Sequence, residues 1–275
     1  MESVNLSSYE YPHPEPESSP FQTIAILGTS DMHGQITSTD WEVNSSLTLK
    51  QGGLILFRSY LKAMREEWKE NLLWLDAGDQ FQGTLESNMF NGSSMTEFYN
   101  FAGLDCAVIG NHEFDFGFDA LTDRFQQSNF PYLGANLFNR SSKQFVQFPN
   151  FFQSYVKTIH NITIGIIGLI ANETPTISGA NLSNFSFESY EPIIESEAAF
   201  LRQSKHASII VLLVPFGTAC SSETPFEIFD LKPRNSSSRQ GACSKNSELF
   251  QVLNRSKPGV VDVWVGGHTH TMVHH

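Results

Sequence analysis

The sequence predicts a single α/β domain, a sheet protein with helices packed against its strands. Short runs of Val, Ile and Leu alternate along the chain with stretches of helical periodicity, and this alternation is typical of α/β folds. The chain has 275 residues, of which 40% are hydrophobic and 17% charged. That length and balance allow one large domain with a well-filled core.

Five continuous apolar runs predict central strands covered on both faces. They lie at residues 24–27, 72–75, 107–109, 209–214 and 261–265. Two more runs, 156–159 and 162–167, are joined by His160 and Asn161 and predict a β-hairpin. The longest apolar run, 162–170, is too short to cross a bilayer, which takes roughly 18 residues or more.

Helices are predicted between these strands. The first is indicated by one apolar stripe at alternating spacings of three and four residues. Its members are Leu54, Phe57, Leu61, Met64 and Trp68. Residues 118–127 and 193–204 predict two further helices, and the polar segment 221–247 predicts an exposed loop insertion.

The charge, the amino-terminal segment and the cysteines of the chain bear on its partners and its compartment. The net charge of −12 and the pI of about 5.1 argue against a nucleic-acid polymer as a partner.

Residues 1–20 are rich in Ser, Pro and Glu, lack the apolar core of a signal peptide and predict a disordered arm ahead of a folded domain at 21–275. Cys106 is predicted to be a buried thiol, whereas Cys220 and Cys243 could form a disulfide in an oxidising compartment.

N-glycosylation acceptors are more frequent than the composition alone would give, which favours an extracellular or secretory-pathway protein. They are Asn5, Asn44, Asn91, Asn139, Asn161, Asn172, Asn181, Asn184, Asn235 and Asn254. The alternative is a genome simply rich in Ser and Asn. A mature or truncated start would reconcile the acceptors with the missing signal peptide.

Four polar blocks follow apolar runs and offer only oxygen and nitrogen ligands. They are Asp31-Met32-His33, Gly78-Asp79, Gly110-Asn111-His112-Glu113 and Gly266-Gly267-His268-Thr269-His270. Ligand sites of α/β sheets form beyond the carboxyl ends of the strands, where all four blocks should meet. Each block alone could be an ordinary turn, and the strand pleat could point the last two histidines apart. Together the blocks predict a two-metal phosphate-ester hydrolase.

The same stretches resemble a known family. They are TSDMHG (29–34), GGLILFRSYL (52–61), LDAGDQFQGTLESNMFNG (75–92), VIGNHEFDFG (108–117), IGIIGLIANETP (164–175) and VGGHTH (265–270). The chain is similar in these stretches to the calcineurin-like metallophosphoesterases, specifically the 5′-nucleotidase/apyrase branch. The resemblance implies a two-sheet β-sandwich flanked by helices, with the metal site at the carboxyl ends of the strands.

Ligand roles follow from the resemblance residue by residue. Asp31 and His33 would hold a first divalent metal, Asp79 would bridge two metals, Asn111 and His268 would hold the second, and His270 would return to the first. His112 would be the catalytic histidine, oriented by Asp115. Zinc or manganese suits these donors best, with iron or magnesium as alternatives.

The implied activity is hydrolysis of small phosphate monoesters by a hydroxide that two metals activate. The resemblance further implies nucleoside 5′-phosphates as substrates in the full-length context, where a carboxyl-terminal domain, absent from this sequence, would select the nucleotide. A broader phosphatase or a 2′,3′-cyclic-nucleotide phosphodiesterase on the same scaffold is an alternative.

One position departs from the family pattern. Pro215 stands where the family has a histidine that binds the second metal, and proline cannot coordinate a metal. His206 precedes the strand and should lie at its opposite end. The departure predicts a weaker second site, and it supports another alternative: a catalytically impaired member that serves as a binding or interaction protein.

Overall fold

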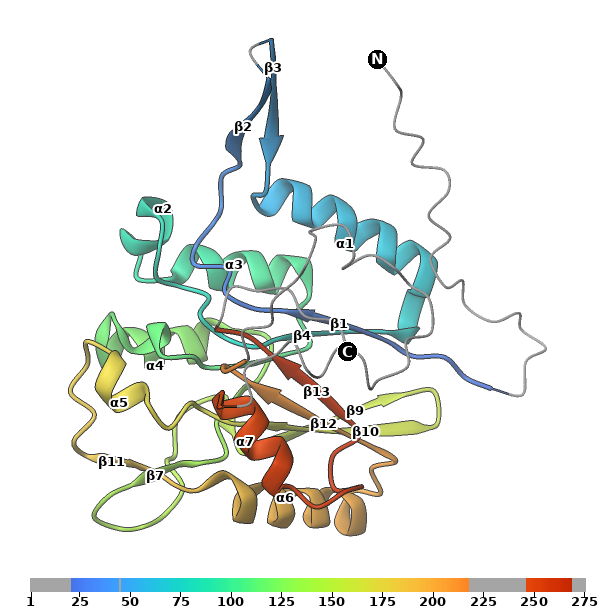
Figure 1. The fold of residues 1–275 in the computed structure, drawn as a ribbon, viewed down its shortest axis with the longest axis vertical. Helices are drawn as coiled ribbons and strands as arrows, with labels where there is room; N and C mark the ends of the chain where they lie inside the picture. The colour runs from blue at the N-terminus through green and yellow to red at the C-terminus, as the bar shows by residue number, and fades with distance from the viewer. Residues whose placement is uncertain (1–20, 45, 218–245, 269–275) are drawn as a thin grey trace.

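Two β-sheets pack face to face between two layers of helices (Figure 1). The computed structural model describes residues 21–44, 46–217 and 246–268. Helices α1 (Leu54–Trp68), α3 (Ser93–Ala102) and α4 (Gly117–Gln127) cover one sheet, while α6 (Tyr190–Ser204) and α7 (Glu248–Arg255) cover the other. This arrangement confirms the predicted α/β class and the two-sheet sandwich flanked by helices.

The first sheet has five strands, all parallel, and the second has four. In spatial order the first contains β1 (Ala25–Thr29), β4 (Leu72–Asp76), β5 (Cys106–Val108), β6 (Tyr132–Leu133) and β8 (Phe151–Phe152). The second contains β13 (Val263–Gly266), β12 (Ile209–Val214), β10 (Ile162–Gly168) and β9 (Ser154–Ile159). Only the β9–β10 hairpin is antiparallel in the second sheet.

Shorter strands and helices lie outside the two main sheets. Two separate two-stranded antiparallel sheets are formed by β2 (Thr39–Asn44) with β3 (Leu47–Gln51) and by β7 (Leu137–Asn139) with β11 (Phe185–Phe187). The short helices are α2 (Leu85–Asn88), α5 (Thr174–Ile177), η2 (Lys69–Asn71) and η3 (His112–Phe114). Among the residues that the structure describes, no helix has both the length and the apolar character needed to cross a membrane.

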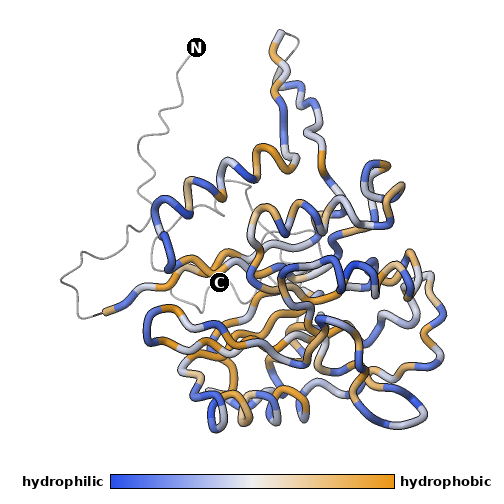
Figure 2. The backbone as a smooth tube through the Cα atoms, turned by 180° about the vertical axis from the view of Figure 1, so that it is seen from behind, coloured by the Kyte–Doolittle hydropathy of each residue, from blue (hydrophilic) through white to orange (hydrophobic). Residues whose placement is uncertain are grey.

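Alternation along the strands builds three layers of core. On β4, Leu73 and Leu75 point into the core between the sheets, while Leu72 and Trp74 point toward the helices. Side chains of successive strand residues face opposite sides of a sheet, so a strand buried on both faces must be apolar throughout. Figure 2 shows this as hydrophobic colour concentrated along the strands in the middle of the molecule. The runs at 72–75, 107–109 and 209–214 thus form inner strands, as predicted, whereas the runs at 24–27 and 261–265 form the edge strands β1 and β13, whose residues are mostly half-buried.

Most predicted elements are confirmed, with shifted ends. The strand predicted at 209–214 is β12, and the predicted hairpin is β9–β10. The helix predicted at 193–204 begins three residues earlier, at Tyr190. Pro192 does not prevent this start, because it lies in the first turn, where its missing N–H is tolerated. Helices α3 and α7 and the short strands β6 and β8 were not predicted. Cys106 is buried and unpaired, as expected.

Several predictions lie outside the described residues. These are the disordered arm at 1–20, nearly all of the loop at 221–247, and the pairing of Cys220 with Cys243.

The two sheets meet closely along their edge strands. A Cβ atom on Gly28 of β1 would lie 2.8 Å from Val265 Cγ1 of β13. Strands β1, β4 and β5 of one sheet and β12 and β13 of the other therefore bring their carboxyl ends to the same side of the sandwich. The loops that follow these strands contain the four polar blocks.

Candidate metal centre

Backbone hydrogen bonds join the loop after β1 to the loop after β4. The amide of Asp31 donates to the carbonyl of Gly78 at 2.9 Å, and the amide of His33 donates to the carbonyl of Asp79 at 3.0 Å. The two loops thus run side by side beyond the sheet. These main-chain contacts hold the polar side chains of the two loops close to one another.

Asp31, His33 and Asp79 form a three-residue cluster of potential metal ligands. One ligand atom from each lies within 4.8 Å of the others. The Nδ1 atom of His33 is 2.7 Å from the carbonyl oxygen of Gln82. Because a carbonyl can only accept, the proton is on Nδ1 and the lone pair is on Nε2, the usual arrangement of a metal-binding histidine.

Asp79 also borders a second set of donors, Asn111 and His268. The Nδ1 atom of His268 lies 3.6 Å from Oδ2 of Asp79. Asn111 is 3% exposed, and its buried Oδ1 accepts no hydrogen bond from any residue that the structure describes. A buried carbonyl oxygen without a donor is destabilising, and a cation beside it would remove the penalty.

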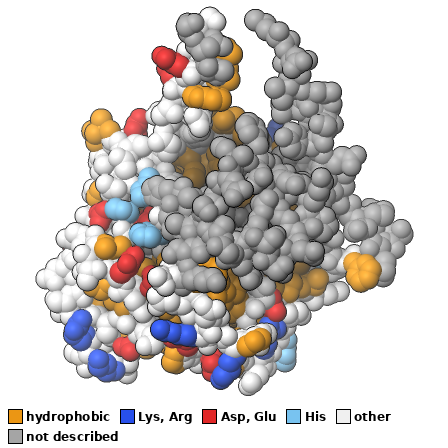
Figure 3. Space-filling view, in the orientation of Figure 1, with side chains coloured by type: hydrophobic (Ala, Val, Ile, Leu, Met, Phe, Trp, Pro, Cys, Tyr) orange, Lys and Arg blue, Asp and Glu red, His pale blue; other side chains and the backbone are white. Residues whose placement is uncertain are grey.

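The donors fit divalent cations in both chemistry and spacing. Two ligands of a tetrahedral ion with bonds of about 2.1 Å are roughly 3.4 Å apart, close to the separation of Asp79 Oδ2 and His268 Nδ1. Carboxylate, imidazole and amide oxygen donors are ordinary ligands of zinc and manganese. In Figure 3, histidine side chains lie next to acidic side chains on the exposed face of the molecule.

The titration behaviour of Asp79 and His268 reflects their contact. Burial by itself raises the pKa of Asp79, but His268, the His112 amide and the charges of His112 and His33 together hold that pKa below its usual value. The carboxylate of Asp79 in turn raises the pKa of His268, against the effect of burial. Without a cation, the negative carboxylate favours a protonated ring beside it.

Four candidate ligands adopt left-handed backbone conformations. The φ angles are 53° for Asp31, 45° for His33, 55° for Asp79 and 74° for His268. Each such conformation costs an L residue roughly 1–2 kcal/mol, so surrounding contacts must impose it. Strain of this kind concentrates where side chains must be aimed at a ligand.

Gly110 gives Asp79 the space that it occupies. A Cβ atom on Gly110 would lie 2.2 Å from Asp79 Oδ1, so any other residue would collide with the carboxylate. The same carboxylate oxygen accepts a hydrogen bond from the His112 amide at 3.0 Å. The loop after β5 therefore both makes room for Asp79 and orients it.

Glu113 joins the loops after β4 and β5 through four amides. Its Oε2 accepts from Gly110 N at 2.6 Å and Asp79 N at 2.8 Å, and its Oε1 accepts from Gln80 N at 2.6 Å and Phe81 N at 3.2 Å. The side chain is fully buried, and burial together with the Asp79 charge raises its pKa. A proton on either oxygen would face two N–H donors, so the geometry holds Glu113 as a carboxylate.

Asp76 occupies a similar buried position beneath the site. Its carboxylate accepts from Thr29 Oγ1 at 2.6 Å, Gln80 Nε2 at 2.7 Å, Gly78 N at 3.0 Å and Tyr99 OH at 3.1 Å. Burial raises its pKa to about 6, although these hydrogen bonds oppose the rise.

His112 and Asp115 form a pair at the start of the loop after β5. The Nδ1 atom of His112 is 2.7 Å from Oδ2 of Asp115. The carboxylate can only accept, so it fixes a proton on Nδ1, which leaves Nε2 as the atom that can exchange a proton. The ring also lies against the His33 ring, with centroids 5.2 Å apart.

The structure brings together most of the predicted site residues. Asp31, His33 and Asp79 cluster, Asn111 and His268 border Asp79, and His112 contacts Asp115. His270 lies outside the described residues. Pro215 is buried directly after β12, next in the sheet to the strand that leads to His268.

Two buried carboxylates at the site were not predicted, Asp76 and Glu113. Both belong to the polar stretches singled out in the sequence, yet neither was assigned a role. The available signal was an acidic residue within or directly after a fully apolar strand, where an uncompensated charge is rare.

Comparison with known proteins agrees with this architecture. The profile of the calcineurin-like phosphoesterase family matches residues 24–272. The chain therefore belongs to the calcineurin-like phosphoesterases, a family that uses divalent metals.

Its relatives include 5′-nucleotidases, which confirms the resemblance to that branch. The chain is 32% identical to the 5′-nucleotidase of Mus musculus, in a match that covers 69% of this chain and 33% of the relative. It is 28% identical to Protein 5NUC of Lutzomyia longipalpis, in a match that covers 91% of this chain and 39% of the relative. It thus spans between a third and two fifths of these relatives. The solved NAD nucleotidase of Haemophilus influenzae shares the fold, with a TM-score of 0.67 and 24% identity over 90% of this chain and 38% of that one.

We expect the substitution Glu113→Gln to destabilise the domain by about 3 kcal/mol. The amide nitrogen of glutamine would face two backbone N–H donors that cannot reverse their role. Urea unfolding of the metal-free protein measures the loss. The control is Glu86→Gln, since Glu86 is exposed and accepts a hydrogen bond from Thr37. Equal stability of Glu113→Gln and wild type would contradict the role of the carboxylate.

We expect Asp76 to make stability fall as the pH rises from about 4 to about 6. Its folded-state pKa of about 6 exceeds the ordinary value of 3.8, so the folded protein binds more protons in this window. The difference of about two pKa units corresponds to roughly 3 kcal/mol. Unfolding free energies across this pH range should fall less in Asp76→Asn, whose amide can donate to the Thr29 and Tyr99 hydroxyls. Parallel pH profiles for the two proteins would be the contrary result.

Proposed function

We propose that the site binds two divalent cations that share Asp79. Asp31 and His33 complete the first position, together with His270, and Asn111 and His268 contribute to the second. The observation that supports the second position is the buried Asn111 Oδ1, which has no hydrogen-bond donor among the described residues. Zinc and manganese match the donor set best, with iron and magnesium as alternatives.

With these cations bound, we propose that the chain hydrolyses phosphate monoesters. The cations would neutralise the phosphate and lower the pKa of the attacking water. His112 would protonate the departing alkoxide through Nε2, and Asp115 would keep its ring oriented. The polar contacts that fix Asp79 and His112 before any substrate binds would reduce the reorganisation needed for catalysis.

Nucleoside 5′-phosphates are the proposed substrates of the full-length protein. The names of the relatives support this choice, because several are 5′-nucleotidases. The chain spans only about a third of the first of these, so nucleotide selection is proposed for the whole protein and phosphate-ester cleavage for the domain described above.

Pro215 favours a second candidate function, that of a catalytically impaired member that binds a metal or nucleotide. It occupies the end of β12, beside the strand that leads to His268, and it has no donor atom to offer a cation. A water molecule could take the missing position, so a weakened second site and a working enzyme are compatible. The substitution Pro215→His distinguishes a working enzyme from an impaired member, because it should restore phosphate release only in the impaired member.

An extracellular setting is proposed from the glycosylation acceptors. Asn161 is exposed in the turn between β9 and β10, where a glycan would not disturb the sheet. We expect a form secreted from eukaryotic cells behind an added signal peptide to lose one glycan in Asn161→Gln and equally in Thr163→Ala. Gel mobility before and after glycosidase treatment measures the change. Unaltered mobility in both variants would exclude Asn161 as an attachment site.

The catalytic proposal is tested by phosphate release from AMP and from an aryl phosphate in the presence of manganese. We expect Asp79→Ala to lower the rate by more than about 100-fold, since even outer partners of metal ligands are worth 10- to 100-fold. The control is Asp40→Ala, which removes only an exposed pair with Lys50. We expect Pro215→His to change the rate little.

Other outcomes separate the candidates. Activity that appears only in Pro215→His would favour the impaired member. An inactive wild type that Pro215→His does not rescue, and that binds no manganese, would contradict the two-metal proposal.

A further inference from the structure

We propose that Glu173 is a positioning residue of the metal centre, which orients the His268 ring so that its Nδ1 atom faces Asp79. This inference rests on the proposed function, because it assigns to His268 the role of a metal ligand. Glu173 follows β10 of the second sheet, His268 follows β13, and Asp79 follows β4 of the first sheet. The three side chains therefore connect the two halves of the sandwich.

The His268 ring lies between two carboxylates. Its Nδ1 atom is 3.6 Å from Asp79 Oδ2, and its Nε2 atom is 3.4 Å from Glu173 Oε1. A carboxylate can only accept, so each one favours a proton on the ring nitrogen that it faces. A cation bound beside Asp79 would displace the proton on Nδ1, and the remaining proton on Nε2 would then face Glu173, which fixes the tautomer that metal binding needs.

A carboxylate paired with a ligating histidine is a recurrent arrangement in metal sites. The outer carboxylate fixes the tautomer, limits rotation of the ring and makes the ligating nitrogen more basic. His33 obtains the same effect from the Gln82 carbonyl. Glu173 would give His268 its counterpart, so that each candidate position has one histidine with a defined tautomer.

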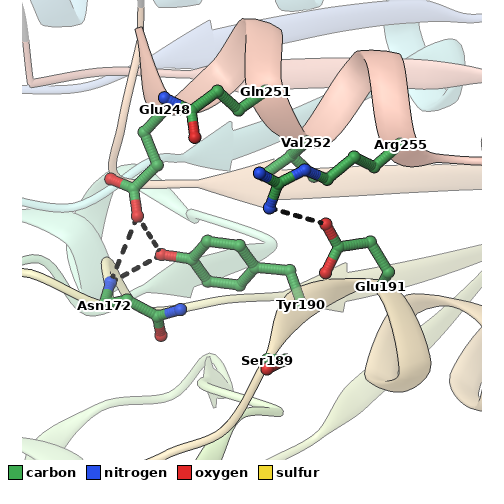
Figure 4. A pocket seen from close by; sticks show the side chains of 8 residues that line it. All are labelled: Asn172, Ser189, Tyr190, Glu191, Glu248, Gln251, Val252 and Arg255. Carbon is green, nitrogen blue, oxygen red and sulfur yellow. Dashed lines mark hydrogen bonds and ion pairs between the residues drawn. The ribbon is translucent and has the colours of Figure 1, made fainter.

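The residues on either side of Glu173 are anchored. The amide of Asn172 donates to Tyr190 OH at 2.5 Å and to Glu248 Oε1 at 3.4 Å, and Tyr190 OH is itself hydrogen-bonded to Glu248. Figure 4 shows these three groups converging, with Tyr190 from α6 and Glu248 from α7. On the other side, Thr174 is fully buried at the start of α5. The backbone of Glu173 is therefore held in place by two helices of the second layer.

The simpler interpretation is a surface ion pair. Glu173 and His268 have side-chain exposures of 47% and 33%, and ion pairs this exposed contribute little to stability. A surface pair would affect stability slightly and leave metal affinity and ring tautomer unchanged. Those two quantities therefore distinguish the interpretations.

The experiment titrates the metal-free chain with zinc alone by calorimetry, in wild type and in Glu173→Ala and Glu173→Gln. We expect Glu173→Ala to weaken the weaker of two zinc sites by 10- to 100-fold, as for other outer partners of metal ligands. Glu173→Gln should recover part of the loss, because its amide oxygen can still accept from Nε2. The control is Glu195→Gln. Glu195 lies on α6, its side chain is 40% exposed, and it pairs with Lys257.

Nitrogen-15 NMR of the histidine rings provides the second readout. In zinc-loaded wild type we expect the His268 signals, assigned with His268→Asn, to report a protonated Nε2 and a zinc-bound Nδ1. In Glu173→Ala this signature should broaden or give way to a mixture of tautomers, while the urea midpoint for unfolding of the metal-free protein stays close to that of wild type.

The results separate the inference from the function on which it rests. Two zinc ions bound with wild-type affinity and an unchanged His268 signature in Glu173→Ala would overturn the role of Glu173 and leave the two-metal site intact. Absence of zinc binding in wild type would instead overturn the two-metal proposal itself. A loss of affinity equal in Glu195→Gln would also contradict a specific role for Glu173.

Discussion

The Glu113 carboxylate fixes the geometry on which the candidate metal centre depends. It accepts hydrogen bonds from four backbone amides of the two loops that follow β4 and β5. Buried amides without acceptors are destabilising, so these four amides favour the convergence of both loops on this one side chain. The convergence places Asp79 against Gly110 and the His112 amide. Hydrogen bonds within the protein thus place the candidate ligands relative to one another.

A second level of organisation comes from the meeting of the two sheets. Asp31 accepts the His268 amide with both carboxylate oxygens, at 2.9 and 2.8 Å, and Gly267 lies close enough to Asp31 that a Cβ atom there would be 2.9 Å from its Oδ2. The first sheet contributes the acidic ligands, and the second contributes His268 and its neighbour Glu173. Neither sheet contains a complete set of donors.

The sequence predicts the inner frame well because that frame is encoded by local pattern. Runs such as 209–214 are apolar at every position, which only a strand buried on both faces requires. Asp31, Asp79 and His112 were singled out because four polar blocks each follow such a strand, and the carboxyl ends of these strands should meet. Glu113 and Asp76 were missed because their partners are backbone amides and hydroxyls from distant segments, which no spacing reveals. Helix α3 was missed because its cap is Gly92 in the left-handed conformation, without a side-chain signal.

The contact between His268 and Asp31 joins residues 237 positions apart. During synthesis on the ribosome, the loops that hold Asp31, Asp79 and Asn111 emerge long before the strand that leads to His268. A nascent chain can therefore bring Asp31, His33, Asp79 and Asn111 together early, yet it can add His268 only after nearly all of this sequence has been translated. Contacts of such high sequence separation also form slowly in refolding. The arrangement around Asp31 and His268 is accordingly completed late in folding, when the two sheets dock, and under the proposed function binding of a second cation would wait for that step.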